Sequence, residues 1–267
     1  MYAKKSLGQH FLTSEGAVSS ILDASDIVGD DIVLEIGPGK GVLTSKLLFF
    51  AGKVIAVEKD HDLIPILEEK FKKEIKKGKF DLLERDVLDF DPETLRFYDS
   101  EYKVIANIPY YITGQLIRKF LESTFQPERM VLMVQKEVAE RIVAKDHKES
   151  VLSISVKAYG TPHYIQTVKA GSFFPIPNVD SAILLIDNIS KDFFSLLTPS
   201  VNREERFFKM LKAGFKSKRK KLSSNLMEVT SKEKIKAAFE KRGLSDNIRA
   251  EDVSFLEWKE LAREILI

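Results

Sequence analysis

The 267-residue sequence predicts an α/β fold, with a doubly wound, mostly parallel sheet of seven strands followed by a small all-helical C-terminal domain. Between Asp31 and Asp187, short β-branched runs alternate with helical patterns, which is typical of a parallel sheet with helices on both faces. After Asp187 the β-branched runs stop, and only segments with the apolar spacing of amphipathic helices follow. We therefore expect two domains, at residues 1–187 and 188–267.

The chain begins with a polar arm at residues 2–11 and a helix at residues 15–24, which is expected to pack on the sheet. The β-branched runs that we expect to form strands are residues 32–36, 54–58, 80–83, 104–107, 130–134, 164–168 and 182–186. Helical spacing of apolar residues occurs between them at residues 41–50, 63–76, 114–123, 136–144 and 151–159. Further helices are expected in the C-terminal domain near residues 191–197, 204–215, 218–227, 232–241 and 253–265.

The composition excludes several kinds of site. The chain has no Cys, which rules out disulfides, thiol nucleophiles and Cys-ligated zinc or iron–sulfur sites. The His residues have no partners at metal-ligand spacing, so we expect no metal site from His10, His61, His147 and His163. No apolar run approaches the ~20 residues of a membrane span, and no secretory signal is visible. We therefore expect a cytoplasmic protein that is not bound to a membrane.

A glycine-rich turn follows the first expected strand, in the sequence Val33-Leu34-Glu35-Ile36-Gly37-Pro38-Gly39-Lys40-Gly41. Glycines at such a turn let the backbone approach a ligand that a Cβ atom would keep away, so Gly37 and Gly39 are candidate ligand contacts. The Gly-x-Gly-x-Gly spacing differs from the dinucleotide pattern, in which a helix N-terminus meets a pyrophosphate. With Glu35 before the turn, we expect a cationic cofactor without phosphate.

Two carboxylates lie at the ends of the next expected strands. Glu58 comes 21 residues after the first glycine of the turn, close to the offset of ~20 at which an acidic residue accepts from ribose hydroxyls. A solvated surface charge is the alternative for this residue. Asp86 is the candidate acceptor for an adenine amino group, ahead of Asp89 and Asp91, which lie further from the strand end. These positions indicate S-adenosylmethionine, whose positive sulfonium we expect in a favourable field among Glu35, Glu58 and Asp86.

The segment Asn107-Ile108-Pro109-Tyr110 ends the fourth expected strand and sets an amide, a proline carbonyl and an aromatic ring side by side. Adenine N6 is a poor nucleophile because its lone pair is delocalised, and acceptors on its two hydrogens draw it toward a pyramidal shape. The Asn107 side-chain oxygen and the Pro109 carbonyl suit that role, while Tyr110 can stack on the base and stabilise the developing charge. A turn proline with a surface tyrosine is the alternative. The segment therefore favours methyl transfer to adenine.

At this point the chain resembles the KsgA family, the small-subunit ribosomal RNA adenine N6-dimethyltransferases. Besides the glycine turn, Glu58, Asp86 and the segment Asn107-Ile108-Pro109-Tyr110-Tyr111, the resemblance rests on Lys5-Ser6-Leu7-Gly8-Gln9-His10-Phe11-Leu12 and Phe173-Phe174-Pro175-Ile176-Pro177-Asn178-Val179-Asp180-Ser181. It implies a Rossmann-like methyltransferase domain and a helical RNA-binding domain. It also implies that the chain dimethylates N6 of two adjacent adenosines near the 3′ end of small-subunit rRNA, late in subunit assembly.

The resemblance adds two residues of the arm to the expected cofactor site. His10 and Leu12 are implied to bind S-adenosylmethionine together with the residues already named, which include Gly37, Glu58, Asp86 and Asn107. The family commonly has Asn where this chain has His10, and a neutral His still donates one hydrogen bond.

Phe173 begins the Phe-x-Pro-x-Pro-x-Val-x-Ser motif, and its ring is expected to stack on the target base opposite Tyr110. Phe174 is the alternative for that role, since the sequence does not decide between two adjacent rings. A hydrophobic plug, stiffened by Pro175 and Pro177, is a purely structural interpretation of the same segment.

Positive charge is concentrated near the C-terminus. Residues 188–267 carry 18 Lys and Arg against 12 Asp and Glu, while the whole chain has a net charge of only +2. The strongest basic block has no acidic residue and consists of Lys212, Lys216, Lys218, Arg219, Lys220 and Lys221. We expect this block to contact RNA phosphates rather than to form only a solvated face. A target adenosine must be unstacked to react, so we expect it in a loop.

Other functions share some of these features. A large-subunit rRNA adenine methyltransferase of the macrolide-resistance type has the same arm, glycine turn and Asn-x-Pro-Tyr motif, and activity on each subunit's RNA separates the two. A non-catalytic ribosome assembly factor is a different class, against which the intact site residues argue. A DNA adenine methyltransferase is less favoured, because those enzymes usually carry a second proline at Ile108. We expect a monomer that acts on the immature small ribosomal subunit.

Overall fold

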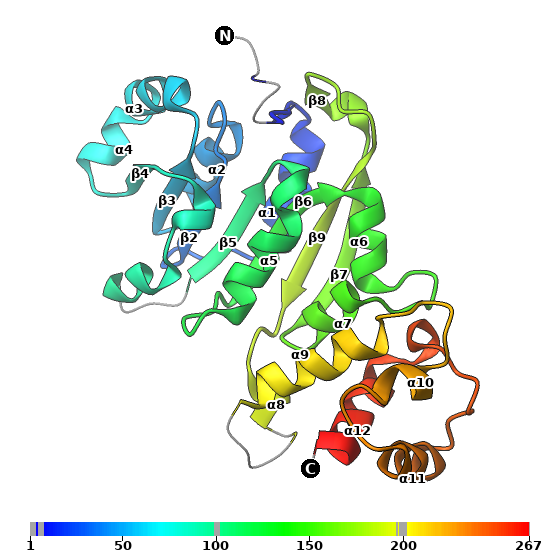
Figure 1. Ribbon diagram of the computed structural model, residues 1–267. Helices are drawn as coiled ribbons and strands as arrows, with labels where there is room; N and C mark the ends of the chain where they lie inside the picture. The colour runs from blue at the N-terminus through cyan, green and yellow to red at the C-terminus, as the bar shows by residue number, and fades with distance from the viewer. Residues whose placement is uncertain (1–3, 5–7, 99–101, 196, 198–201, 267) are drawn as a thin grey trace. The chain divides into compact units, whose positions relative to one another are not determined.

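The computed structural model describes residues 4, 8–98, 102–195, 197 and 202–266. Residues 2, 3 and 5–7 of the arm, which include Lys5, Ser6 and Leu7 of its motif, lie outside the described residues, as does residue 196 of the expected helix 191–197. The chain forms two compact units, one of Met1–Ala139 with Thr161–Ile189 and one of Glu140–Gly160 with Ser190–Ile267 (Figure 1). No helix in the described part of the chain is long and apolar enough to cross a membrane.

The first unit is built on a seven-stranded sheet with the strand order β4-β3-β2-β5-β6-β9-β7. Its parallel strands are β2 (Ile32–Ile36), β3 (Lys53–Glu58), β4 (Phe80–Glu84), β5 (Tyr102–Asn107) and β6 (Arg129–Gln135). The antiparallel extension consists of β9 (Ser181–Asp187) and β7 (Thr161–Val168). The inner strand β2 is buried throughout, as expected for a parallel strand covered on both faces. The predicted mostly parallel sheet is confirmed.

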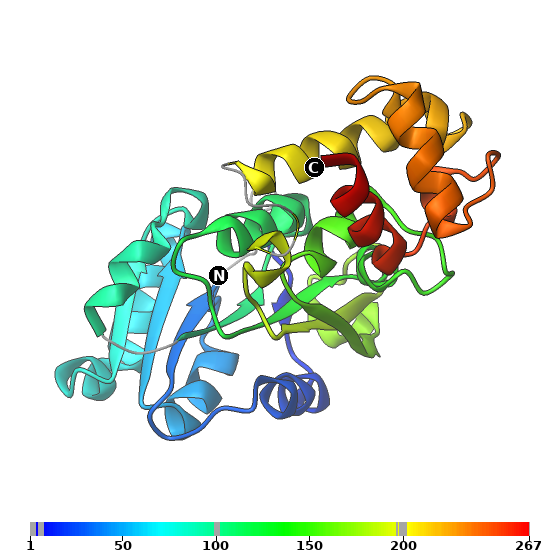
Figure 2. The same cartoon turned by 90° about the horizontal axis from the view of Figure 1, so that it is seen from below.

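Helices cover both faces of this sheet (Figure 2). The helices of the first unit are α1 (Glu15–Ser25), α2 (Val42–Phe50), α3 (Ile64–Lys70), α4 (Lys72–Lys76) and α5 (Thr113–Glu122), and α6 (Lys136–Val143) begins in it. Helices α1 and α2 share one apolar core with the sheet, and α5 lies on the opposite face (Figure 1). The single helix expected at residues 63–76 is interrupted at Phe71.

Candidate site residues meet at the carboxyl edge of the sheet, because parallel strands all end there. Gly37 follows β2, Glu58 ends β3, Asp86 lies two residues after β4, and Asn107 ends β5. Strand β9 runs in the opposite direction, so its first residue, Ser181, lies at the same edge, opposite the end of β6. The alternation of strand and helix therefore determines where the site forms.

A small second sheet fastens the arm beside this edge. Strand β1 (Phe11–Leu12) pairs antiparallel with β8 (Phe173–Phe174), so that Phe11 lies opposite Phe174. The Thr13 backbone N–H extends the ladder by donating to the Ser172 carbonyl at 2.8 Å. The arm and the motif before β9 are therefore held together although they are far apart in the sequence.

The second unit is helical, and the predicted helical C-terminal region is confirmed. Its helices are α7 (Val151–Lys157), α8 (Asp192–Ser195), α9 (Arg203–Gly214), α10 (Leu222–Leu226), α11 (Lys232–Arg242) and α12 (Phe255–Leu266). The Trp258 side chain is fully buried and stacks on Phe215 with ring centroids 5.5 Å apart. A Cβ atom at Gly214 would approach the Trp258 ring within 2.4 Å, so this position requires glycine.

Residues 140–160 belong to the second unit, whereas the sequence placed them in the first domain. The Tyr159 ring packs against Phe194 and Phe208, with centroid distances of 5.0 and 5.9 Å. The Tyr159 carbonyl also accepts the Ser190 backbone N–H at 2.8 Å. The apolar spacing of this segment identified helix α7, but local spacing carries no information about which core a helix joins.

Candidate active site

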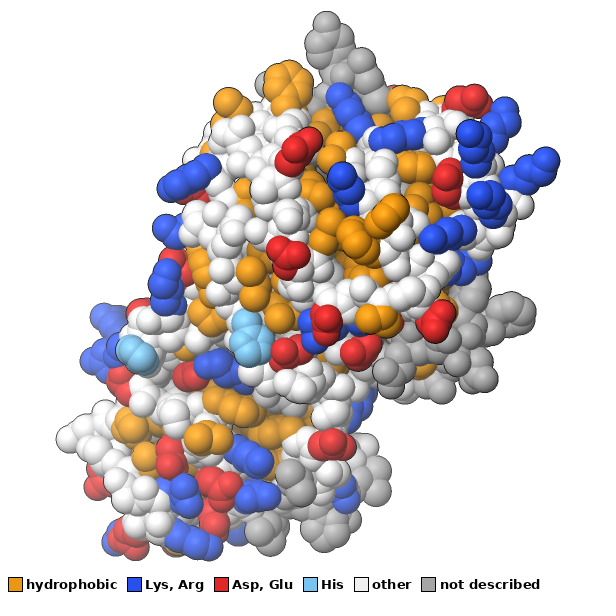
Figure 3. Space-filling view, turned by 180° about the vertical axis from the view of Figure 1, so that it is seen from behind, with side chains coloured by type: hydrophobic (Ala, Val, Ile, Leu, Met, Phe, Trp, Pro, Cys, Tyr) orange, Lys and Arg blue, Asp and Glu red, His pale blue; other side chains and the backbone are white. Residues whose placement is uncertain are grey.

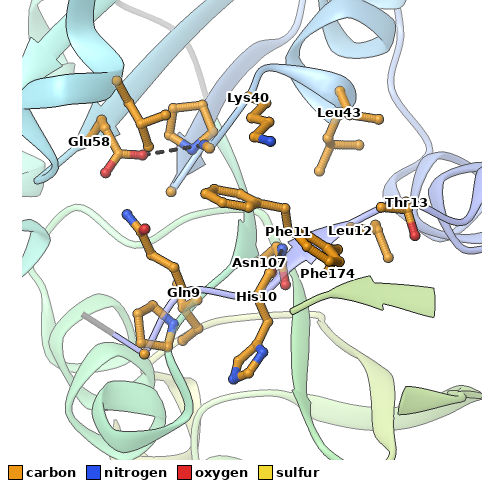
Figure 4. A pocket seen from close by; sticks show the side chains of 18 of the residues that line it. Gln9, His10, Phe11, Leu12, Thr13, Lys40, Leu43, Glu58, Asn107 and Phe174 are labelled. Atoms are coloured by element: carbon orange, nitrogen blue, oxygen red, sulfur yellow. Dashed lines mark hydrogen bonds between the residues drawn. The ribbon is translucent and has the colours of Figure 1, made fainter. Parts of the chain in front are cut away.

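A cavity of about 310 Å³ lies at the carboxyl edge of the sheet (Figure 4). The glycine turn, Glu58 and residues 107–110 form part of its lining, while residues 8–13 of the arm and Phe174 supply another wall. All of these residues belong to the first unit. The structure therefore brings together the glycine turn, the end of β3, the end of β5 and the arm.

The glycine turn needs a backbone without side chains. Gly37 and Gly39 have φ angles of 70° and 57°, in the left-handed region that favours glycine. A Cβ atom would lie 3.2 Å from the Asn107 carbonyl oxygen at Gly37, and 3.0 Å from the Phe11 ring at Gly39. Both glycines line the cavity, so a ligand there can approach the backbone directly.

The Glu58 carboxylate is nearly buried and points toward the glycine turn. Its Oε2 atom accepts the Gly39 backbone N–H at 3.3 Å, and its Oε1 atom accepts the Asp60 backbone N–H at 2.8 Å. Burial raises the pKa of Glu58, and these N–H groups lower it, with a net increase. Each carboxylate oxygen has a second lone pair, so the group can still accept from ligand hydroxyls.

Glu35 does not contribute the negative charge that the sequence suggested. Its side chain is 1% exposed beneath the glycine turn and does not line the cavity. Burial raises the pKa of Glu35 to about 8, against opposing effects of Thr44 and Lys70. The carboxyl is therefore mostly neutral at pH ~7, and the expected field reduces to Glu58 and Asp86.

A second cavity of about 210 Å³ contains Asp86 and shares Gly37, Glu58, Ile108 and Pro109 with the first cavity. The Asp86 carboxylate accepts the Leu88 backbone N–H at 2.9 Å and the Lys59 ammonium at 2.7 Å. Burial alone raises the pKa of Asp86, but Lys59 and Leu88 bring it below its ordinary value. Asp86 is thus an ionised acceptor at the edge of this cavity.

The rival carboxylates, Asp89 and Asp91, line neither cavity. Apolar side chains, among them Val57, Val87 and Ile112, line the same cavity as Asp86, together with the cations Lys59 and Arg85. A flat apolar ring with one amino group suits this combination of apolar walls and the Asp86 acceptor.

Asn107 and Pro109 present acceptors to the first cavity. The Asn107 amide nitrogen donates to the His10 carbonyl at 3.3 Å, which turns the amide oxygen away from the arm. The Pro109 carbonyl accepts the Ile112 backbone N–H at 3.2 Å and keeps a second lone pair. The strand end and the following turn, Tyr110–Ile112, therefore fix both acceptors.

Tyr110 lines the same cavity, and its hydroxyl is held 2.8 Å from the Ser181 hydroxyl. Burial raises the pKa of Tyr110 and the Ser181 contact lowers it, with a net increase, so the phenol is neutral. The His10 ring lies nearly parallel to the Tyr110 ring, with centroids 6.1 Å apart and an interplanar angle of 16°. His10 Nδ1 lies 2.7 Å from the Pro175 carbonyl oxygen, and because that oxygen only accepts, Nδ1 carries the proton.

The expected stacking role of Phe173 does not fit its position. Phe173 is 2% exposed within the apolar core, whereas Phe174 is 63% exposed and lines the cavity. Successive side chains of a strand point to opposite sides, so pairing of β8 with β1 sends one ring to the core and the other to the cavity. Leu12, on the same strand pair as Phe173, lines the cavity although it is mostly buried.

The basic block belongs to the second unit and is described on its own. Lys212 lies in the last turn of α9, and the other cations lie between α9 and the start of α10; all of them are exposed. The buried Asn225 amide nitrogen holds this loop by donating to the carbonyls of Gly214 and Ser217, at 2.6 and 3.2 Å. Lys216 pairs with Glu228 at 2.8 Å.

Several residues that line the two cavities or hold the arm were not identified from the sequence. Lys59 and Tyr111 line the Asp86 cavity, and Gln9 and Phe11 form part of the arm's wall in the first cavity. Asp60 accepts a hydrogen bond from the Gln9 side chain of the arm at 2.6 Å. Only Asp60 had a usable signal, because it follows Glu58 by two residues at the end of a strand. No group of three or more His, Cys, Asp or Glu placed to hold a metal ion occurs among the described residues.

Comparison with known proteins places these features in a family. The sequence is 44% identical over 264 residues to a protein of Dehalococcoides mccartyi strain CBDB1 named ribosomal RNA small subunit methyltransferase A, covering 98% of this chain and 88% of that one. The structure is similar to a dimethyladenosine transferase from Plasmodium falciparum, with a TM-score of 0.75, 27% identity, and 94% and 96% of the two chains covered.

It is also similar to the 23S rRNA methyltransferase ErmE, with a TM-score of 0.79 and 96% and 100% coverage, but the identity of 22% makes this a likeness of fold alone. The sequence model of the family described as "Ribosomal RNA adenine dimethylase" matches residues 1–266. That match spans both structural units. The chain therefore belongs to the ribosomal RNA adenine dimethylase family.

Proposed function

We propose that this protein transfers methyl groups from S-adenosylmethionine to N6 of two adjacent adenosines in a loop near the 3′ end of small-subunit rRNA. The product is N6,N6-dimethyladenosine, formed during biogenesis of the small ribosomal subunit. The observation that carries the proposal is the first cavity, in which the acceptors of Asn107 and Pro109 and the ring of Tyr110 border the glycine turn. The 44% identity to a small-subunit methyltransferase supports the choice of RNA.

The residues present fit S-adenosylmethionine. The two cavities share Gly37 and Glu58, and a Cβ at Gly37 or Gly39 would crowd Asn107 or Phe11, which line the first cavity. Glu58 would accept from the ribose hydroxyls and Asp86 from the adenine amino group. The rest of the cofactor would be contacted by His10, Leu12, Gly39 and Asn107. When bound, this cofactor would supply a methyl group carried by a positively charged sulfur, and Glu58 would supply negative charge in the first cavity.

The chain's own residues would act on the target adenine by positioning and electrostatics. Asn107 Oδ1 and the Pro109 carbonyl would accept from the two N6 hydrogens and turn the nitrogen lone pair outward. Tyr110 and Phe174 would hold the ring by stacking, and their π faces would stabilise the positive charge that develops on the base. The N6 proton can leave to water after transfer, so no side chain is required as a general base.

The basic block would bind the RNA backbone. Lys212, Lys216, Lys218, Arg219, Lys220 and Lys221 are exposed, and Asn225 keeps their loop ordered. Such a block supplies affinity for phosphates without sequence preference. Recognition of the loop would then depend on its shape and on the unstacked target base. We propose that the protein acts as a monomer, in the cytoplasm, on the immature subunit.

The alternative functions are separable. Likeness of fold does not decide between small-subunit and large-subunit RNA, because the TM-scores of 0.75 and 0.79 are nearly equal. The sequence identity over nearly the whole chain favours the small subunit. The acceptors at Asn107 and Pro109 and the open cavity favour an enzyme over a non-catalytic assembly factor.

The test is methyl transfer from labelled S-adenosylmethionine to unmodified small-subunit particles, large-subunit particles and naked rRNA, with the labelled base located by mass spectrometry. Dimethyladenosine at two adjacent small-subunit positions is expected. Label confined to large-subunit RNA would replace the proposal with the resistance-type activity. Cofactor binding without label on any substrate would leave an assembly factor as the better interpretation.

A further inference from the structure

The Asp60 carboxylate is almost fully buried, at 3% exposure, and its side-chain partners come mainly from the arm. Its Oδ2 atom accepts the Gln9 amide N–H at 2.6 Å, and its Oδ1 atom accepts the Lys4 ammonium. The Lys4 backbone N–H in turn donates to the Gln9 side-chain oxygen at 2.8 Å, so the two arm residues hold each other. Burial alone raises the pKa of Asp60, but the hydrogen bonds from Lys4 and Gln9 bring it below its ordinary value.

Asp60 is also joined to the proposed ribose acceptor. Its backbone N–H donates to Glu58 Oε1 at 2.8 Å, and its Oδ1 atom caps the following 3-10 turn, His61–Leu63, by accepting the Asp62 N–H at 3.2 Å. One short turn at the end of β3 therefore presents a carboxylate to the cofactor cavity and a second carboxylate to the arm.

The arm held in this way forms a wall of the cavity. Residues 8–13 line it, and the Phe11 ring reaches toward the glycine turn, within 3.0 Å of where a Gly39 Cβ would be (Figure 4). Beyond Phe11 the arm is fastened by β1–β8 pairing and by the Thr13 N–H bond to Ser172. Before it, the side-chain bonds of Lys4 and Gln9 to Asp60 tie the arm to the end of β3. The Asp60 contacts therefore secure the end of the arm that faces the Glu58 side of the cavity.

We propose that Asp60 is a positioning residue, which holds the arm closed over the cofactor cavity and thereby sets how fast the cofactor leaves. The proposal rests on the S-adenosylmethionine site proposed above. Asp60 touches neither the cofactor nor the target base; it acts through Gln9 and Lys4 on the wall that residues 8–13 provide. The Asp60 backbone N–H binds Glu58, the proposed ribose acceptor, and the Asp60 side chain binds Gln9 of the arm. Cofactor binding at Glu58 and the position of the arm are therefore coupled through this turn.

The test compares Asp60→Ala, Gln9→Ala and the double variant in the full-length protein. Stopped-flow displacement of S-adenosylmethionine measures its dissociation rate, and hydrogen exchange measures protection of amides 8–13. Each single substitution is expected to raise the dissociation rate about tenfold, the usual effect of losing a hydrogen bond to a buried charge. The double variant is expected to dissociate no faster than Asp60→Ala, because both substitutions break the same contact.

Two further variants separate positioning from a purely structural role. Asp60→Asn keeps one side-chain oxygen, which can either cap the 3-10 turn or accept from Gln9, and is expected to lose only part of the effect. Asp62→Ala removes the exposed second carboxylate that pairs with Lys4 at 2.7 Å, and is expected to leave dissociation unchanged. A loss of stability alone would lower the melting temperature without selective exchange at residues 8–13.

Unchanged dissociation and unchanged arm protection in Asp60→Ala would overturn the proposal. The proposal would also be overturned if the effects of Gln9→Ala and Asp60→Ala on the dissociation rate were strictly additive. Additive effects would mean that the two substitutions do not break the same contact. The exchange measurement needs no cofactor, so it tests the anchor even if the wild-type protein binds none. Failure of the wild-type protein to bind S-adenosylmethionine would count instead against the proposed function.

Discussion

The Gly39 backbone N–H donates to Glu58 Oε2 at 3.3 Å and ties the end of β3 to the glycine turn that follows β2. These strands are neighbours in the sheet, so the bond spans adjacent strand ends rather than a single loop. The same carboxylate accepts the Asp60 N–H through its other oxygen. Glu58 is therefore oriented by two backbone donors before any ligand arrives, and its remaining lone pairs have a fixed direction.

Glu58→Gln is expected to weaken cofactor binding about tenfold or more. The amide preserves the shape, but its NH₂ group faces one of the two backbone donors, and the charged acceptor for ribose hydroxyls is lost. Isothermal titration with S-adenosylhomocysteine measures the effect. Glu84→Gln, at the exposed end of the next strand, is the matched control and is expected to bind like the wild type. Equal affinity in all three proteins would remove Glu58 from the cofactor site.

Asn107→Ala is expected to reduce the single-turnover rate of methyl transfer by about 10²-fold or more, the usual effect of losing one preorganised polar group at the reacting centre. RNA affinity, measured by fluorescence anisotropy, is expected to stay within about twofold, because phosphates supply most of it. The exposed Asn247→Ala in the second unit serves as control. Wild-type turnover in Asn107→Ala would contradict the role of the amide as an N6 acceptor.

Phe174→Ala is expected to lower activity, whereas Phe173→Ala is expected to lower stability. Loss of the Phe174 ring, which lines the cavity at 63% exposure, should lower kcat/KM for RNA while leaving the melting temperature near that of the wild type. Loss of the Phe173 ring opens a cavity in the core and should cost about 3–5 kcal/mol of unfolding free energy. Chemical denaturation and initial rates measure both. The reverse pattern would return the stacking role to Phe173.

The strand-end residues of the site could be predicted because their positions follow from a local pattern. Each apolar β-branched run ends where the chain turns polar, and parallel strands bring all such ends to one edge. Gly37, Glu58, Asp86 and Asn107 were identified in this way and lie around two adjoining cavities. Their roles in binding and catalysis remain predictions.

Other features depend on contacts that no local pattern encodes. The contact between Gln9 and Asp60 joins positions 51 residues apart. The exchange of roles between Phe173 and Phe174 depends on the register of a two-residue strand, where a shift by one residue reverses the sides. The neutral state of Glu35 follows from burial under helix α2, which the sequence showed only as an acid before a glycine turn.

Neutralising Lys218, Arg219, Lys220 and Lys221 together should weaken RNA binding and flatten its dependence on salt. Each lost phosphate contact lowers the slope of log K against log salt by about 0.7–0.9. A control with the same charge change removes Lys72, Lys73, Lys76 and Lys77, exposed around α4. Figure 3 shows Lys and Arg side chains gathered along the edge of the first unit that α3 and α4 cover.

Anisotropy titrations at several salt concentrations measure the two slopes. The α4 variant is expected to keep the wild-type slope, because four exposed cations outside an RNA contact release no counterions on binding. Equal slopes in the wild type and both variants would make the basic block a solvated face.

Glu35→Gln is expected to make the stability of the protein less sensitive to a rise in pH from 4.5 to about 8. Burial raises the pKa of Glu35 to about 8 in the folded state, above the ordinary value of 4.5. A raised carboxyl pKa gives stability that is fully present below the unfolded pKa and is lost as pH rises through the folded pKa. The free energy of unfolding of the wild type should therefore fall by up to about 1.4 kcal/mol per pH unit between pH 4.5 and pH about 8, from this group alone.

Denaturant unfolding from about pH 5 to about pH 9 measures this slope. Glu35→Gln resembles the protonated carboxyl in shape and does not ionise, so its curve should be flatter and should lie above that of the wild type at the alkaline end. Glu68→Gln removes an exposed carboxylate of α3 and should reproduce the wild-type slope. A wild-type slope in Glu35→Gln would mean that the carboxyl ionises freely beneath the glycine turn, and the negative field first expected from it would then be restored.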